Sequence, residues 1–382
     1  MNVSVIIDAL AVGALLTFLP YVVIQLALLA RNRHLWAVGP GPPIESRRLL
    51  VVIVTNGKSP TLTDRIAATV DGYGLPNVIV RSLVEERDTH RYFGERIAVP
   101  SSFRTPNGSS FKCRALHYFA GWLREAGYGA DTYVLHLDDD SVPSRDYVRH
   151  ALAMTSDAGQ GLIRLRETGH SVFSTVSDFV RILDCDTYCA YANSRGKPVH
   201  VHGEGLVIRA DIEAEIGWDF GDRVADDYLM GQKLREAGRT FGHIPAHIYI
   251  APPTTSRDFF RQRRRWFTFF HRSVRQSWKM NRAATAWLLV REVSAPATLV
   301  GLAVWIAVIA LGVHVPTPLV AACIANMGGS VAVSQYGAYR TDSLRNQLLA
   351  AALILPASVF QAASWVYAMT TRVVSFDTVV KA

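Results

Sequence analysis

Tyr133-Val-Leu-His-Leu-Asp-Asp-Asp140 is the stretch that decides the fold. Its first five residues are mostly apolar and predict a buried strand, which ends at three consecutive carboxylates. Adjacent carboxylates repel one another, so a cation is the natural counter-charge, and oxygen ligands favour Mg²⁺ or Mn²⁺. Alternate residues at a strand end point the same way, so Asp138 and Asp140 are the predicted metal ligands, with Asp139 turned elsewhere. A solvated acidic turn is the alternative interpretation.

The chain before this stretch alternates between strand and helix patterns. The predicted strands cover residues 49–54, 77–84 and 133–137, and the predicted helices cover 60–70 and 111–126. This alternation predicts an α/β domain with a mostly parallel sheet. Ligands of such sheets bind beyond the carboxyl ends of the strands. The turn Thr55-Asn56-Gly57 and the acidic triplet both follow strands directly, so we expect them at the same edge.

Three stretches without Asp, Glu, Lys or Arg flank this middle part, at residues 9–30, 293–339 and 346–371. A bilayer span needs about 20 apolar residues. The first and third stretches are each long enough for one span, and the second for two, broken at residues 314–318. Buried core helices are the alternative. The expected organisation is a transmembrane helix in 1–32, a soluble domain in 33–256, an interfacial region in 257–290, and about three transmembrane helices with a tail in 291–382.

The distribution of charge predicts the orientation of an integral protein of the cell membrane. Arg31, Arg33 and His34 follow the first span, and no Lys or Arg precedes it. Basic residues stay on the cytoplasmic side, so the large domain is expected to be cytoplasmic. The net charge of +8 suits an anionic leaflet. Nucleic acid is not an expected partner, because the basic residues cluster beside the spans. The four cysteines form no recognisable zinc pattern, and reduced thiols are expected.

Two segments after residue 220 carry further candidate residues. Ala225-Asp226-Asp227 opens a predicted helix that runs to Glu236. Acidic residues at a helix start are commonly caps, although a carboxylate there could also take a proton from a hydroxyl group. In the segment 257–282, aromatic and apolar residues recur every four positions at Trp266, Phe270, Val274 and Trp278, beside a run of arginines. This pattern predicts a basic amphipathic helix lying on the membrane surface.

The motifs together resemble a known family. Gln262, Arg265 and Trp266 match the Q-x-x-R-W motif of processive-type family 2 glycosyltransferases, the relatives of cellulose and hyaluronan synthases. The acidic triplet resembles their metal-binding D-x-D, and Ala225-Asp226-Asp227 stands where they carry T-E-D. The implied fold is a nucleotide-sugar-binding, GT-A-like domain joined to transmembrane helices.

A closer resemblance is to the egghead-type β-1,4-mannosyltransferases, over about residues 48 to 270. Residues 54–57 resemble their V-T-R-G, 111–116 their F-K-A-R-A-L, 202–205 their H-G-S-F, and 262–267 their Q-R-R-R-W-F. The chain departs from the pattern at Ala225-Asp226-Asp227, which keeps the last carboxylate, and at His202-Gly203-Glu204, where Glu replaces Ser.

The resemblance implies a role for each motif residue. A Mg²⁺ or Mn²⁺ ion on Asp138 and Asp140 would neutralise a diphosphate leaving group. Asp227 would be the catalytic base. The implied contacts to the donor and its phosphates are Thr55, Gly57, Lys112, Arg114, Asp138, Gln262 and Arg265. The implied acceptor contacts are Trp266, His202, Gly203 and Asp226. Position alone makes Glu85 and Glu86 candidates for contact with the nucleoside.

The implied activity is an inverting transfer of a hexose from a nucleotide-sugar to a lipid-linked sugar or glycolipid acceptor, forming a β-glycosidic bond, with mannose from GDP-mannose as one candidate donor. Membrane lipids are the other expected partners. Two alternatives remain open. A processive β-polysaccharide synthase would need more spans to thread a polymer. A non-catalytic sugar-binding membrane protein would not need to retain Asp138, Asp227 and the Q-x-x-R-W residues.

Overall fold

The computed structural model describes residues 22–36, 38–166, 171–198, 201–221, 226–290, 335–341 and 343–371, together with a few isolated positions before residue 22 and between 292 and 332. Most of the predicted spans in 9–30 and 293–339 lie outside these residues. Within them, residues 22–32 are helical and lead into the short helix η1 (Arg33–Leu35).

A mixed eight-stranded sheet forms the centre of the domain, in the order β3-β2-β1-β4-β7-β6-β8-β5. The strands are β1 (Arg48–Val54), β2 (Val78–Glu85), β3 (Glu95–Val99), β4 (Thr132–Asp138), β5 (Val142–Pro143), β6 (Ala158–Leu165), β7 (Val207–Arg209) and β8 (Phe241–Ile250). Neighbours β3, β2, β1 and β4 are parallel, as are β6 and β8, whereas β7 runs antiparallel between β4 and β6. The prediction of an α/β domain with a mostly parallel sheet is confirmed, as are its three predicted strands.

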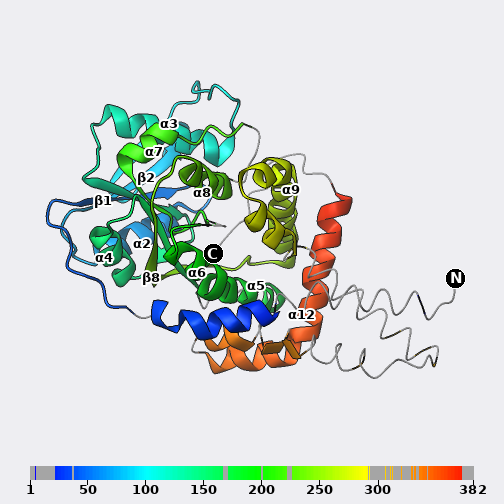
Figure 1. The fold of residues 1–382 in the computed structure, drawn as a ribbon. Coiled ribbons are helices and arrows are strands. Elements are labelled where there is room, and N and C mark those ends of the chain that lie inside the picture. The colour runs from blue at the N-terminus through cyan, green and yellow to red at the C-terminus, as the bar shows by residue number, and fades with distance from the viewer. Residues whose placement is uncertain are drawn as a thin grey trace.

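Helices cover both faces of this sheet, so its central strands are buried almost along their whole length. The helices are α2 (Pro60–Asp71), α3 (Phe111–Glu125), α4 (Arg145–Ala153), α5 (Val172–Asp184), the π-helical turn η2 (Cys185–Cys189), α6 (Ala190–Ser194), α7 (Ala210–Ile216), α8 (Asp226–Glu236), α9 (Ser256–Met280) and α12 (Leu344–Thr370). Figure 1 shows α3 and α7 on one side of the sheet and α2 and α4 on the other. Alternate residues of β1 enter the two cores, because successive strand side chains point to opposite faces: Leu49 and Val51 pack toward α2 and α4, and Leu50 and Val52 toward α3.

The strand register sets the position of the polar residues that follow β1 and β4. Val54, the last residue of β1, is paired with Asp138, the last residue of β4, in a parallel register. The turn that begins at Thr55 and the carboxylates that follow Asp138 therefore leave the sheet side by side, at its carboxyl edge. This confirms the expectation that both motifs share one edge.

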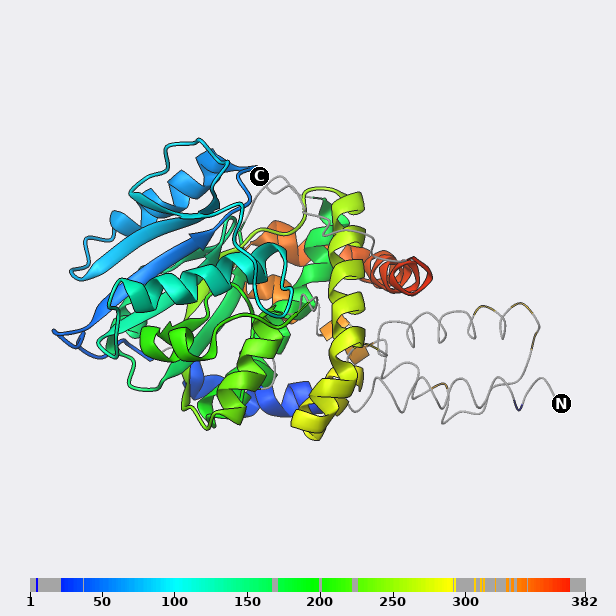
Figure 2. The same ribbon diagram turned by 90° about the horizontal axis from the view of Figure 1, so that it is seen from above.

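Helices α9 and α12 pack against each other on the side of the molecule away from β1, as Figure 1 and Figure 2 both show. Among the described residues, α12 is the one helix long and apolar enough to cross a membrane, and its most apolar stretch has a mean hydropathy of 1.7. Only 22% of its most apolar stretch is buried, which is low for the core helix of a soluble protein. This helix coincides with the predicted span in 346–371 and gives membrane association limited support.

Helix α9 is amphipathic, but the face that it buries differs in part from the predicted apolar stripe. Phe259, Gln262, Ser273 and Ser277 are buried against the protein, whereas Trp278 is 43% exposed. An interfacial position for this helix stays a prediction.

A buried charge network joins the sheet to the helices at its edge. Asp186 of η2 is fully buried and accepts two hydrogen bonds from the Arg164 guanidinium, at 2.9 and 3.0 Å. Its carboxylate also accepts hydrogen bonds from Tyr336 (2.7 Å) and Arg340 (3.1 Å). Burial, followed by the charge of Arg164, lowers the pKa of nearby His247 on β8 to about 4.

The pKa of His247 predicts a loss of stability in mild acid. The unfolded chain takes up a proton on this histidine below about pH 6.5, and the folded chain does so only near pH 4. The free energy of unfolding is therefore unaffected by His247 above pH 6.5. It decreases as the pH falls toward 4, by about 2 kcal/mol at about pH 5. His247→Gln should show a smaller difference in thermal unfolding midpoint between about pH 7.5 and pH 5 than the unmodified chain. An equal difference in the two proteins would contradict the prediction.

Candidate functional site

Four segments that are distant in the sequence meet at the carboxyl edge of the sheet. Lys112, at the start of α3, donates a hydrogen bond from Nζ to Asp138 Oδ1 at 2.6 Å. The backbone N–H of Gly203 donates to Asp227 Oδ2, at the start of α8, at 2.9 Å. A Cβ atom on Gly203 would lie 2.8 Å from Lys112 Nζ and 3.6 Å from Asp227 Oδ2. An ammonium group and two carboxylates therefore surround this glycine within a few ångströms.

The three carboxylates of the acidic triplet take different partners. Asp138 pairs with Lys112, and its side chain is 30% exposed. Asp139 Oδ2 accepts a hydrogen bond from Thr55 Oγ1 at 3.1 Å, and Asp140 is 1% exposed. Hard carboxylate oxygens are the ligands that Mg²⁺ and Mn²⁺ prefer, so this donor set fits either ion. Joint ligation by Asp138 and Asp140 stays a prediction.

The turn after β1 forms one wall of the site and requires glycine. Gly57 has φ +78°, and a Cβ atom there would lie 2.6 Å from Asp88 Oδ2. Its N–H donates to Thr55 Oγ1 at 3.1 Å, which ties the turn to the end of the strand. Asp88 also accepts from the Tyr92 hydroxyl at 2.5 Å, and burial together with this hydrogen bond raises the pKa of Tyr92.

Asp88 and Tyr92 belong to a polar cluster that the sequence did not reveal. It includes Asp64, which accepts from the Phe93 N–H at 2.7 Å and pairs with His90 at 2.8 Å. These residues come from α2 and from the segment between β2 and β3, and no short motif links them. Because they lie beside Gly57, they are candidates for contact with whatever binds at the ends of β1 and β2.

Lys112 and Arg114 share the start of α3 but take different directions. The Arg114 guanidinium pairs with Glu85 at the end of β2 and donates to the carbonyl oxygens of Pro100 (3.1 Å) and Phe103 (3.2 Å). Arg114 thus holds a loop beside the site, and its contact with a phosphate stays a prediction. Glu86 accepts a hydrogen bond from the Ser101 N–H at 2.8 Å, which lowers the pKa of Glu86.

An arginine of α5 connects Trp266 of the predicted Q-x-x-R-W motif with the segment 202–204 of the site. Arg181 pairs with Glu204 at 2.5 Å and lies over the Trp266 ring, 4.9 Å from its centroid. Arg263 lies 4.4 Å from the same ring centroid and pairs with Asp178. Two guanidinium groups therefore contact the Trp266 ring, and one of them pairs with Glu204 in the segment that begins at His202.

The structure shows less about the remaining predicted residues, which are Gln262, Arg265 and Asp226. Gln262 is 3% exposed, and its side-chain carbonyl oxygen has no hydrogen-bond partner among the residues that the structure describes. Arg265 is partly buried on α9. Ala225 and the side chain of Asp226 lie outside the described residues, so the role of Asp226 stays a prediction.

His202 points toward two thiols to which the sequence assigned no role. Its Nε2 lies 3.2 Å from Cys185 Sγ and 3.7 Å from Cys189 Sγ. Its predicted contact with an acceptor therefore stays untested. The only sequence signal for this cluster was the spacing Cys-x₃-Cys followed by a histidine thirteen residues later, which matches no common pattern.

Comparisons with known proteins agree on one group of enzymes. The profile of glycosyl transferase family group 2 matches residues 133–333, more than half of the chain of 382 residues. The chain is 27% identical to beta-1,4-mannosyltransferase egh of Drosophila melanogaster over 242 residues, 59% of this chain and 52% of the fly protein. It is 27% identical to beta-1,4-mannosyltransferase bre-3 of Caenorhabditis briggsae over 180 residues, 44% of this chain and 39% of that protein. The chain thus spans about half or less of the length of the curated relatives it matches, and the resemblance to the egghead type is confirmed.

The fold is shared with solved structures. One of them is a mannosyltransferase from Pyrobaculum calidifontis in complex with GDP-Man and Mn²⁺, with a TM-score of 0.53 and 16% sequence identity. The match covers 91% of this chain and 99% of that chain. At this identity the likeness supports the GT-A-like fold.

The pairing of Lys112 with Asp138 predicts competition between the lysine and a divalent cation. Lys112→Met removes the ammonium group from the carboxylates, so Mn²⁺ should bind about tenfold more tightly, a difference of about 1.4 kcal/mol. Lys233→Met is the matched control, because it removes the same charge from an exposed pair with Glu236. Mn²⁺ affinity is measured by electron paramagnetic resonance of the free ion. Equal or weaker binding by Lys112→Met would show that Asp138 does not belong to the cation site.

Proposed function

Because this chain belongs to glycosyl transferase family group 2, we propose that it transfers mannose from GDP-mannose to a lipid-linked sugar, with inversion and with the aid of Mg²⁺ or Mn²⁺. The observation that carries the proposal is the meeting of Asp138, Lys112, Gly203 and Asp227 at the carboxyl edge of the sheet. The choice of donor is supported by the relatives, which are named as mannosyltransferases, and by the structural neighbour with GDP-Man and Mn²⁺.

On the donor side, the residues at the ends of β1 and β4 act on the nucleotide diphosphate. A divalent cation held by Asp138 and Asp140 would neutralise the negative charge that develops on the leaving group. The Lys112 ammonium group, 2.6 Å from Asp138, adds a second positive charge beside the same position. Thr55 and the turn at Gly57 would line the donor side of the site at the end of β1.

On the acceptor side, Asp227 removes the proton from the attacking hydroxyl group. The Gly203 N–H donates to Oδ2 of Asp227 at 2.9 Å, and the Tyr228 N–H donates to Oδ1 at 2.8 Å, which orients the carboxylate. The acceptor oxygen forms a bond to the anomeric carbon while the bond from that carbon to the phosphate oxygen breaks. Since attack and departure occur on opposite faces, an α-linked donor gives a β-linked product.

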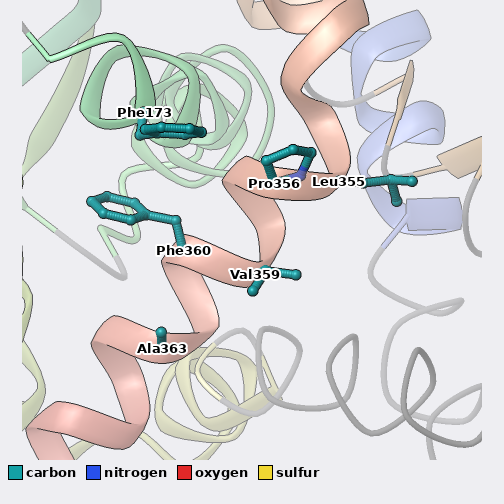
Figure 3. Close-up of a pocket in the computed structure, with 6 residues that line it drawn as sticks. All are labelled: Phe173, Leu355, Pro356, Val359, Phe360 and Ala363. Atoms are coloured by element: carbon teal, nitrogen blue, oxygen red, sulfur yellow. The ribbon is translucent and has the colours of Figure 1, made fainter. Parts of the chain in front are cut away.

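An apolar groove supports the proposal that the acceptor is lipid-linked. Figure 3 shows the residues that line it: Phe173 of α5, and Leu355, Pro356, Val359, Phe360 and Ala363 of α12. The Phe360 ring also packs on Phe259 and Phe260 of α9, at centroid distances of 4.8 and 5.0 Å. Trp266 follows Phe259 by about two helical turns, or about 10 Å. A hydrocarbon chain in this groove would leave its sugar near Trp266.

The proposed site of action is the cytoplasmic face of a membrane. The apolar helix α12, which is little buried, and the basic residues that follow the first uncharged stretch support this orientation. The bilayer would then supply the acceptor to the groove from the side.

Exchange of a single carboxylate tests the catalytic base. Asp227→Asn keeps the volume and can still accept one of the two backbone hydrogen bonds, from Gly203 or from Tyr228, but it cannot accept a proton at neutral pH. Single-turnover transfer from GDP-mannose should fall by about 10²–10⁴-fold. Donor affinity by calorimetry should stay within about threefold, because this carboxylate faces the acceptor.

Asp226→Asn is the matched control and should lose much less activity. A dead Asp226→Asn beside an active Asp227→Asn would assign the base to the preceding residue. Normal transfer by both would show that these carboxylates only cap α8. Mass spectrometry of the product distinguishes addition of one sugar from the polymer of a processive synthase.

A bulky side chain in the groove tests the lipid-linked acceptor. Val359→Trp should raise KM about tenfold for a long-chain acceptor, which corresponds to about two methylene groups left in water, and should not change KM for a short-chain analogue. Val366→Trp is the matched control, because Val366 is similarly exposed on α12 but does not line the groove. If Val359→Trp changes KM equally for the long-chain and short-chain acceptors, or changes neither KM, the groove does not bind the acceptor's hydrocarbon chain.

A further inference from the structure

A second cluster of ligand-forming side chains lies behind the site, and it contains sulfur. The ligand atoms of Cys185, Cys189 and His202 all lie within 4.8 Å of one another. Cys185 is fully buried, Cys189 is 5% exposed and His202 is 8% exposed. Among the described residues, no other group of three histidine, cysteine or acidic side chains is arranged to hold a metal ion.

A π-helical turn between two α-helices carries both cysteines. Helix α5 continues into the π-helical turn η2, which begins at Cys185 and ends at Cys189, and then into α6. Residues four apart on a helix lie on the same face, so both thiols point toward one neighbour. Single π-helical turns within α-helices are rare and frequently occur at functional sites.

The histidine is held in place by a side chain of β6. The backbone N–H of His202 donates to Gln160 Oε1 at 2.9 Å, and Gln160 Nε2 donates to the carbonyl oxygens of His202 (2.6 Å) and Glu204 (3.1 Å). Gln160 is itself 2% exposed. The segment 202–204 is therefore fixed by its backbone, which leaves the imidazole aimed at the two sulfur atoms.

We propose that Cys185, Cys189 and His202 bind a zinc ion. Tetrahedral zinc with Zn–S near 2.3 Å and Zn–N near 2.0–2.1 Å separates a sulfur and a nitrogen ligand by about 3.6 Å. The two observed separations, 3.2 and 3.7 Å, lie close to that value on either side. The side chains need only small shifts to surround the ion. Each thiol releases its proton on binding, and two thiolates balance the charge of the ion, so the occupied site is neutral in its buried position.

This ion differs from the cation expected beside the diphosphate. Sulfur and imidazole ligands select zinc, whereas the carboxylates of the acidic triplet select magnesium or manganese. Three protein ligands leave one coordination position for water. The ion would tie η2 to His202, and the residue after His202, Gly203, orients Asp227.

Metal analysis of the full chain in detergent tests the site without any substrate. The unmodified protein, purified without chelator, should carry about one zinc per chain by mass spectrometry of the metal. After replacement by Co²⁺ it should show a thiolate-to-cobalt charge-transfer band. The double variant Cys185→Ser with Cys189→Ser should lose both signals. Cys113→Ser, which removes another buried cysteine on α3, should keep them.

A further variant separates loss of the ligand from loss of the fold. His202→Cys should retain the metal, since three thiolates also bind zinc, whereas His202→Gln should not. A folded protein without zinc or the cobalt band, a Cys185–Cys189 disulfide in its place, or metal retained by the double cysteine variant would each overturn the proposal. Zinc bound to an inactive chain would refute the proposed function alone, and an active chain without zinc would refute this site alone.

Discussion

The fully buried carboxylate of Asp186 is the constraint on which the arrangement of the domain depends. A buried charge is tolerated only when it is paired and hydrogen-bonded, and removing one partner of such a pair typically costs about 3–5 kcal/mol. Asp186 meets this requirement with Arg164 of β6, Tyr336 and Arg340, while its backbone carbonyl accepts hydrogen bonds from the segment 32–36. The sheet, the turn η2 and two segments from opposite ends of the chain must therefore meet at one point.

This constraint extends to the site because Asp186 lies inside the π-helical turn. Its neighbours in the turn, Cys185 and Cys189, contact His202, and the next residue after His202 donates its backbone N–H to Asp227. Few contacts separate the buried network from the proposed base. The packing of the C-terminal segments and the orientation of the proposed base are thus connected. Buried residues far from the sheet edge therefore help to position the site at that edge.

The sequence predicted those features that depend on local pattern. The apolar run of β1 and the strand before Asp138 follow from burial on both faces, and the parallel register then brings Thr55 and Asp139 together. Long-range partners carry no such signal. The antiparallel strand β7, three residues long, has no periodicity to detect. Likewise, nothing near Arg114 indicates that it pairs with Glu85 across the sheet edge.

The replacement of Ser by Glu at position 204, where the chain departs from the egghead pattern, has an electrostatic explanation. Arg181 and Arg263 are both buried beside Trp266, and both pair with Asp178. Glu204 adds a second carboxylate beside these buried guanidinium groups through its pair with Arg181 at 2.5 Å, and a buried charge is tolerated only when it is paired. A serine here would remove one of the two carboxylates that pair with Arg181. The substitution therefore changes the support of Trp266, on the proposed acceptor side, and leaves the contact between Lys112 and Asp138 on the donor side as it is.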